Sequence, residues 1–248
     1  MSLTEEIAAA LAADTAELYA LVGGLDLDLP TPADGWTVRD TVAHLHASDL
    51  AALAALDGAD LTAHLGQVVD ARYVGEDLLA DWNRDQRAVR AAVLARPATA
   101  GKIGWFGPPM SPASFLTARL METWAHGVDI KDAAGVPLTA GAGLRHVCDL
   151  GVRTRGWSYL VHGLDAPDPP PAVRLQHRGE QWNWGTEAAG QHVSGPALHF
   201  ALLVTQRRHR DDLELVAQGA DADRWLDLAQ AFAGPPGRGR SPGARVNR

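Results

Sequence analysis

The segment Arg119-Leu-Met-Glu122-Thr-Trp-Ala-His126-Gly-Val-Asp129 carries a carboxylate and an imidazole at helical spacing. On a helix, Glu122 and His126 lie one turn apart on the same face, where both side chains can bind one metal ion. A third ligand has to come from elsewhere in the chain. The earlier segment Thr41-Val-Ala-His44-Leu-His46 offers two further imidazoles, so the residue types and spacing point to metal chemistry.

The ionisable residues of this helix form a narrow stripe. At 100° per residue, all of them between Ala113 and Ile130 fall within a sector of roughly 80°; they are Arg119, Glu122, His126 and Asp129. A helix on a protein surface usually has a broad charged face, so a thin polar line on an apolar helix indicates groups that converge on an interior site. The alternative is an exposed stripe with an ion pair between Arg119 and Glu122.

The residues alone do not choose between His44 and His46. The two side chains lie about 200° apart on a helix, so they cannot both bind the same ion. His46 lies closer to the apolar stripe of its helix. His44 shares a face with the small residues Ser48, Ala51 and Ala55, which would leave room for a cavity.

Composition defines the broad class. The chain has 248 residues, 46% hydrophobic content and no apolar run long enough to cross a bilayer, which predicts a globular protein. A net charge of -8 argues against nonspecific binding to nucleic acid. The N-terminal residues lack the basic and apolar segments of a signal peptide, so we expect a cytoplasmic protein, either a monomer or a homodimer.

Cys148 is the only cysteine, which excludes an internal disulfide and a thiolate cluster. It lies inside an apolar helical pattern, so a buried structural thiol is expected rather than a nucleophile.

The hydrophobic periodicity divides the chain into a helical part, residues 1–165, a smaller α+β part, residues 166–235, and a disordered tail, residues 236–248. Helices are predicted over 3–22, 37–56, 76–96, 111–131 and 140–162, and their spacing indicates an antiparallel bundle. Thr37 and Asp40 form a capping-box pattern at the start of the second helix. After the stiff linker 166–171, a hairpin over 173–185, a helix over 196–209, a strand over 213–217 and a helix over 222–232 are expected.

Two further segments each have two interpretations. Trp105 and Phe106 lie in a loop rich in Gly and Pro, where they would line a ligand site or act as a lid, or else pack against the end of the bundle. Arg207 and Arg208 lie at the end of a predicted helix, where they would bind an anionic group or simply offset the helix dipole.

Together, Trp36-Thr-Val-Arg-Asp-Thr-Val-Ala-His44-Leu and the segment from Arg119 to Asp129 resemble the mycothiol-dependent maleylpyruvate isomerase group of the DinB-like metalloenzyme superfamily. The resemblance covers nearly the whole chain. It implies a mainly α fold, in which a DinB-like four-helix bundle precedes a smaller α+β domain related to sterol carrier proteins. It also implies the metal ligands His44, Glu122 and His126, which selects His44 over His46.

On this basis His46 is either a residue that lines the site or an ordinary buried histidine. Asp129 and Arg119, on the polar stripe, are expected to support the ligands or line the pocket. Two imidazoles and one carboxylate leave a metal position open, as in catalytic zinc sites, although this ligand set does not exclude Ni, Fe or Mn.

The resemblance implies that mycothiol is a cosubstrate, whose sulfur adds to a small electrophilic substrate. Isomerisation follows if the adduct rotates and expels the thiol, and S-transfer results if the adduct persists. Two other functions use the same features. A metal-dependent hydrolase would work without thiol, and a non-catalytic binding protein would enclose a small apolar ligand between its parts.

Overall fold

The computed structural model describes residues 1–64, 66, 68, 73, 75–106, 109–186, 190–237 and 239–244. It divides into two compact units: the first covers Met1–Gly143, and the second begins at Leu144. Among the described residues, no helix is both long and apolar enough to cross a membrane.

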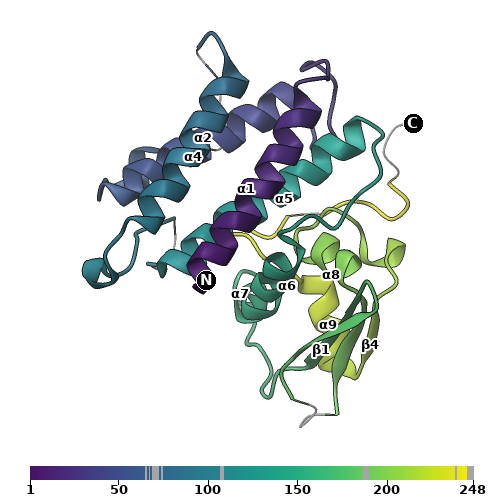
Figure 1. Ribbon diagram of the computed structural model, residues 1–248. Coiled ribbons are helices and arrows are strands. Elements are labelled where there is room, and N and C mark those ends of the chain that lie inside the picture. Colours follow the sequence, from purple (N-terminus) through teal and green to yellow (C-terminus); the bar gives the residue numbers. More distant parts are fainter. Residues whose placement is uncertain are drawn as a thin grey trace. The chain divides into compact units, whose positions relative to one another are not determined.

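Among the described residues, the first unit contains four long helices: α1 (Leu3–Val22), α2 (Val38–Leu56), α4 (Leu78–Leu94) and α5 (Pro112–Ala133). Helix α1 packs along α5 and α2 along α4, and α2 and α5 also contact each other (Figure 1). Two short 3-10 helices, η1 (Leu61–His64) and η2 (Ala98–Ala100), lie in the connections before and after α4. The predicted bundle is therefore confirmed.

Local sequence defines the ends of the helices that carry the metal-ligand candidates. The capping box predicted at α2 is present, because Asp40 Oδ2 accepts from the Thr37 backbone N–H at 2.8 Å while the Thr37 side chain accepts from the Asp40 backbone N–H. Helix α5 begins at Pro112, and the Ser111 hydroxyl accepts from the Ser114 N–H at 3.2 Å. These caps satisfy N–H groups that the first turns leave without partners.

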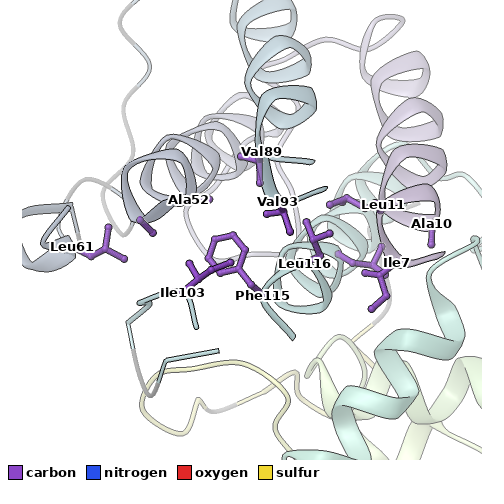
Figure 2. Packing of buried hydrophobic residues seen from close by; sticks show 13 residues of the cluster. Ile7, Ala10, Leu11, Ala52, Leu61, Val89, Val93, Ile103, Phe115 and Leu116 are labelled. Atoms are coloured by element: carbon purple, nitrogen blue, oxygen red, sulfur yellow. The ribbon is translucent and has the colours of Figure 1, made fainter. Parts of the chain in front are cut away.

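Within the part of the bundle that the structure describes, two apolar clusters pack between the helices. The first joins all four helices and is shown in Figure 2; its larger members are Ile7, Leu11, Val89, Val93, Ile103, Phe115, Leu116 and Leu120. The second cluster is built from Leu18, Val22, Val38, Val42, Leu45, Leu78, Trp82 and Ile130. On α5, Glu122 and His126 lie between the residues that belong to the first cluster and Ile130 of the second.

The second unit is a small α+β domain, as predicted. Its helices are α6 (Leu144–Arg153), α7 (Arg155–Leu160), α8 (Ala197–Val204) and α9 (Ala220–Leu228), with the short 3-10 helix η4 (Arg210–Asp212) between α8 and β4. Its strands are β1 (Ala172–His177), β2 (Glu180–Trp184), β3 (His192–Pro196) and β4 (Val216–Gln218), in the order β2-β1-β3-β4. Strands β1 and β3 are parallel, and the two outer pairs are antiparallel.

The hairpin of β1 and β2 turns through Arg178 and Gly179, both with positive φ, as a tight turn between twisted strands requires. Other boundaries differ from the sequence prediction. The predicted helix over 140–162 is divided at Thr154 into α6 and α7, and the predicted helix over 196–209 ends at Val204, because Gln206 adopts a left-handed φ of 57°.

The sequence places the domain boundary after residue 165, whereas the second compact unit already begins at Leu144. The reason is packing: α6 lies against α8, and α7 lies against α9. Of the predicted tail, Arg238 and residues 245–248 lie outside the described residues, and the Gly243 N–H donates to the Asp212 carboxylate at 2.9 Å.

The first apolar cluster makes a stability prediction. Leu116 is fully buried, so Leu116→Ala should lower the free energy of unfolding by about 2–5 kcal/mol through lost transfer energy and a cavity. Leu94 is 47% exposed, and Leu94→Ala should change it by only about 0.5 kcal/mol. Urea unfolding of the metal-free proteins measures both changes. Equal effects of the two substitutions would contradict the packing described here.

Candidate metal centre

The side chains of His44, Glu122 and His126 converge inside the bundle, each offering one ligand atom within 4.8 Å of the others. Glu122 Oε2 lies 3.7 Å from His44 Nε2 and 3.5 Å from His126 Nε2. His44 comes from α2, and the other two residues lie one turn apart on α5. The three side chains are 14%, 27% and 11% exposed, so the centre is largely shielded but can be reached from solvent at Glu122.

Each imidazole has a polar contact at its other nitrogen. His44 Nδ1 lies 2.8 Å from the carbonyl oxygen of Val68, so this nitrogen carries the proton and donates it. His126 Nδ1 lies 3.3 Å from Asp129 Oδ2. Contacts of this kind leave the Nε2 lone pair free, and they are typical of histidines that bind metals.

The spacing of the three groups fits an ion. Two atoms that each lie about 2.0–2.1 Å from a tetrahedral ion are roughly 3.4 Å from each other. The separations between Glu122 and the two imidazoles, 3.7 and 3.5 Å, are close to this value and long for direct hydrogen bonds. The residues present therefore suit a divalent ion with two nitrogen ligands and one oxygen ligand.

Glu122 is held in its ionised form. Burial alone would raise the pKa of this carboxyl, but the imidazoles of His126 and His44 outweigh burial and hold the pKa well below its ordinary value. A carboxylate that stays charged at neutral pH suits metal binding.

Trp36, which directly precedes the capping residue of α2, lies against both imidazoles. Its ring is stacked on His126 with a centroid separation of 5.8 Å and an interplanar angle of 14°, and it lies 5.1 Å from the ring of His44. An indole in this position restricts both rings and covers one side of the centre. The sequence pattern predicted no role in the site for Trp36, although its position next to the capping residue of α2 could have indicated one.

The polar stripe of α5 faces the interior. Arg119 is 2% exposed and Asp129 is 1% exposed, so the alternative of an exposed stripe is wrong. Arg119 is paired with Asp49 of α2, with Nη2 3.0 Å from Asp49 Oδ1.

His46 is a buried histidine with a partner of its own. Its Nε2 lies 2.9 Å from Oδ2 of Asp85 on α4, and the same carboxylate accepts two hydrogen bonds from Arg84. Its described contacts therefore favour the second interpretation of this residue, and they lie away from the three converging groups.

The two loop aromatics pack on the bundle. Trp105 and Phe106 both lie against the first apolar cluster, and the Trp105 ring meets Phe115 edge-on at 5.2 Å. The Arg119 guanidinium lies 6.0 Å from the centre of the Trp105 ring. These contacts favour packing over a lid.

Arg207 and Arg208 lie in the second unit, just after α8. Their guanidinium groups donate to the backbone carbonyls of Thr205 and Arg207, each at 2.7 Å. Cations at a helix C-terminus offset the helix dipole without any ligand, so an anion-binding role for either arginine stays a prediction.

Cys148 of α6 is fully buried, as predicted, and burial strongly raises the pKa of its thiol. A thiol of this kind is protonated at neutral pH and is a poor nucleophile.

The family model described as the mycothiol maleylpyruvate isomerase N-terminal domain matches residues 8–131, which is half of the chain and includes every ligand candidate. The chain belongs to the mycothiol maleylpyruvate isomerase family. This membership confirms the resemblance found in the sequence and the prediction that the protein is an enzyme.

Relatives of this protein have similar lengths. Two proteins of Mycobacterium tuberculosis, Rv0036c and MT0041, both described as uncharacterized, are each 44% identical, with 93% of this chain and 96% of the relative covered. The crystal structure of a mycothiol-dependent maleylpyruvate isomerase matches with a TM-score of 0.57 at 15% identity, covering 88% of this chain and 93% of that chain. A histidine-to-alanine mutant of the same enzyme gives a TM-score of 0.58. The structural likeness supports the fold.

The contact between His126 and Asp129 predicts how a substitution of Asp129 affects metal binding. Asp129→Asn should weaken the binding of a zinc ion offered to the three candidate ligands by about 10- to 100-fold, because the amide carries no negative charge beside His126 Nδ1. Asp132→Asn makes the same change one turn further along α5 and serves as the control. Competition titration with a zinc indicator measures both affinities. Equal affinities in the two variants would contradict a role for Asp129.

The lowered pKa of Glu122 predicts a pH dependence in the metal-free protein. A carboxyl whose pKa is lowered on folding stabilises the fold above its ordinary pKa, and this contribution is lost as the pH falls through the lowered value. Glu122→Gln should therefore lower the thermal midpoint at about pH 7. The difference from wild type should shrink below pH 4.5, the ordinary value. Thermal unfolding in chelator at several pH values tests this, and a pH-independent difference would contradict it.

Proposed function

We propose that His44, Glu122 and His126 hold a divalent ion, with zinc as the first candidate. We also propose that this enzyme catalyses a thiol-dependent isomerisation or S-transfer on a small electrophilic substrate. The observation that carries the proposal is the convergence of two imidazole Nε2 atoms on the Glu122 carboxylate, at separations of 3.7 and 3.5 Å. Membership of the isomerase family supports mycothiol as the thiol.

The protein has no accessible thiol of its own, because Cys148 is its only cysteine and is buried. A thiol cosubstrate supplies the missing nucleophile. When bound, a divalent ion would lower the pKa of a coordinated thiol and so make its sulfur nucleophilic at neutral pH. The protein ligands are neutral imidazoles and one carboxylate, which leave a position for this sulfur.

The residues around the centre have distinct roles in the proposed reaction. The Val68 carbonyl keeps the proton of His44 on Nδ1, so that its Nε2 stays available, and Asp129 supplies a negative charge beside Nδ1 of His126. Trp36 covers one side of both rings and limits the entry of water there. In isomerisation, the thiolate sulfur would bond to one alkene carbon while the π electron pair moves onto the electron-withdrawing group of the substrate. The resulting single bond rotates, and return of the electron pair re-forms the double bond and breaks the carbon–sulfur bond, which releases the thiolate unchanged.

Metal content tests the ligand set. Purified untagged wild type should contain close to one zinc per chain, and His44→Ala, Glu122→Ala and His126→Ala should each lose most of it. His46→Ala is the matched control, since its imidazole pairs with Asp85, and it should keep the metal. Elemental analysis gives the contents, with helix content checked by circular dichroism. A wild type that stays metal-free when zinc is added would contradict the proposal.

A second measurement separates thiol chemistry from hydrolysis, which would use the same ligands. In cobalt-substituted protein, a low-molecular-weight thiol should produce a sulfur-to-metal charge-transfer band, because the open position accepts sulfur. A hydrolase or a binding protein predicts no such band. Without a band at saturating thiol, hydrolysis would become the leading function for a protein that holds metal.

A further inference from the structure

A buried ion pair joins the same two helices that carry the ligands. Arg119 of α5 and Asp49 of α2 are 2% and 3% exposed, and Arg119 Nε and Nη2 lie 3.1 and 3.0 Å from Asp49 Oδ1. Neither residue is a ligand of the proposed ion. The pair therefore needs an explanation separate from metal binding itself.

Stability alone is a weak explanation. Removing two charges from water costs a large part of what their attraction returns, and well-packed apolar residues in place of a buried pair are often equally or more stabilising. The best-attested use of such polar groups inside helical assemblies is to fix one register among several that apolar packing would tolerate. Apolar contacts are not directional, whereas an ion pair forms only when its partners are aligned.

The position of the pair suits this use. His44 of α2 faces Glu122 and His126 of α5, while Asp49, further along α2, meets Arg119, which lies earlier in α5. The two helices are therefore antiparallel at this point, and the pair joins them a short way along from the ligands.

Apolar clusters lie on both sides of the ion pair of Arg119 and Asp49. Because apolar contacts are not directional, the ion pair is the contact that can define the register of α2 against α5. Asp49 lies between Leu45 of the second cluster and Ala52 of the first, and Arg119 adjoins Leu120 of the first. One turn before Asp49, His46 is paired with Asp85 of α4 and takes no part in the contact between Asp49 and Arg119.

We propose that Arg119 and Asp49 are positioning residues, which fix the register of α2 against α5 and thereby preorganise His44 opposite Glu122 and His126. This inference rests on the proposed metal site. In it, the ion pair strengthens metal binding rather than the stability of the fold.

The test is a double substitution, Asp49→Leu with Arg119→Met, which removes both charges and keeps apolar volume. We expect the metal-free thermal midpoint to equal or exceed that of wild type, and zinc binding to weaken by about 10-fold, as for other residues that orient metal ligands. The visible absorption of the cobalt-loaded protein should also change, because its ligand geometry is less fixed.

Glu17→Gln is the matched control. Glu17 forms an ion pair of 2.7 Å between α1 and Lys131 of α5, and α1 carries no proposed ligand, so zinc affinity should stay unchanged. Arg119→Lys is a milder variant that keeps the charge but loses the planar fork, and its zinc affinity should fall several-fold. It provides the test if the double variant does not fold.

The outcomes separate the two proposals. Zinc affinity equal to wild type in either folded variant would overturn the positioning role and leave the metal site standing. An equal loss of affinity in Glu17→Gln would also overturn it, because any ion pair on α5 would then suffice. A wild type that binds no zinc would instead overturn the proposed function.

Discussion

The Glu122 carboxylate, held between two imidazoles inside a helical bundle, is the interaction on which this structure depends. A partly buried carboxylate is costly unless other groups stabilise its charge. Here His44 and His126 do so from two helices, and they hold its pKa well below the ordinary range. The arrangement is possible only if α2 and α5 keep one spacing and one register.

The rest of the first unit can be understood from this requirement. Apolar clusters on either side supply the bulk of the burial, and between them lies a layer of polar side chains whose partners are defined. The Val68 carbonyl accepts from His44, Asp129 lies beside Nδ1 of His126, and Trp36 lies against both rings. In the proposed thiol chemistry the sulfur comes from outside the protein, since Cys148 is buried in the second unit. Membership of a family named for a thiol-dependent isomerase is consistent with this need.

Much of this was predictable from local sequence. Helix α1 has the predicted bounds, and the capping box of Thr37 and Asp40 is present, because both depend on contacts within a few residues. The narrow polar stripe on α5 correctly indicated an interior face. The spacing of Glu122 and His126 placed them on one side of that helix.

Other features depend on tertiary contacts that a single sequence does not reveal. Residue patterns left His44 and His46 open, because both lie on one helix and only their partners on α4 and α5 distinguish them. The Val68 carbonyl leaves no trace in side-chain types. The early end of α8 follows from the left-handed backbone at Gln206, and α6 and α7 join the second unit through packing on its helices.

X-ray absorption at the zinc edge tests the central claim most directly. For zinc-loaded wild type, the account predicts only nitrogen and oxygen neighbours at about 2.0–2.1 Å, with the outer-shell scattering of two imidazoles. Adding a thiol should introduce one sulfur neighbour at about 2.3 Å. A spectrum without imidazole scattering would contradict the ligand set. An unchanged spectrum at saturating thiol would contradict the thiol chemistry.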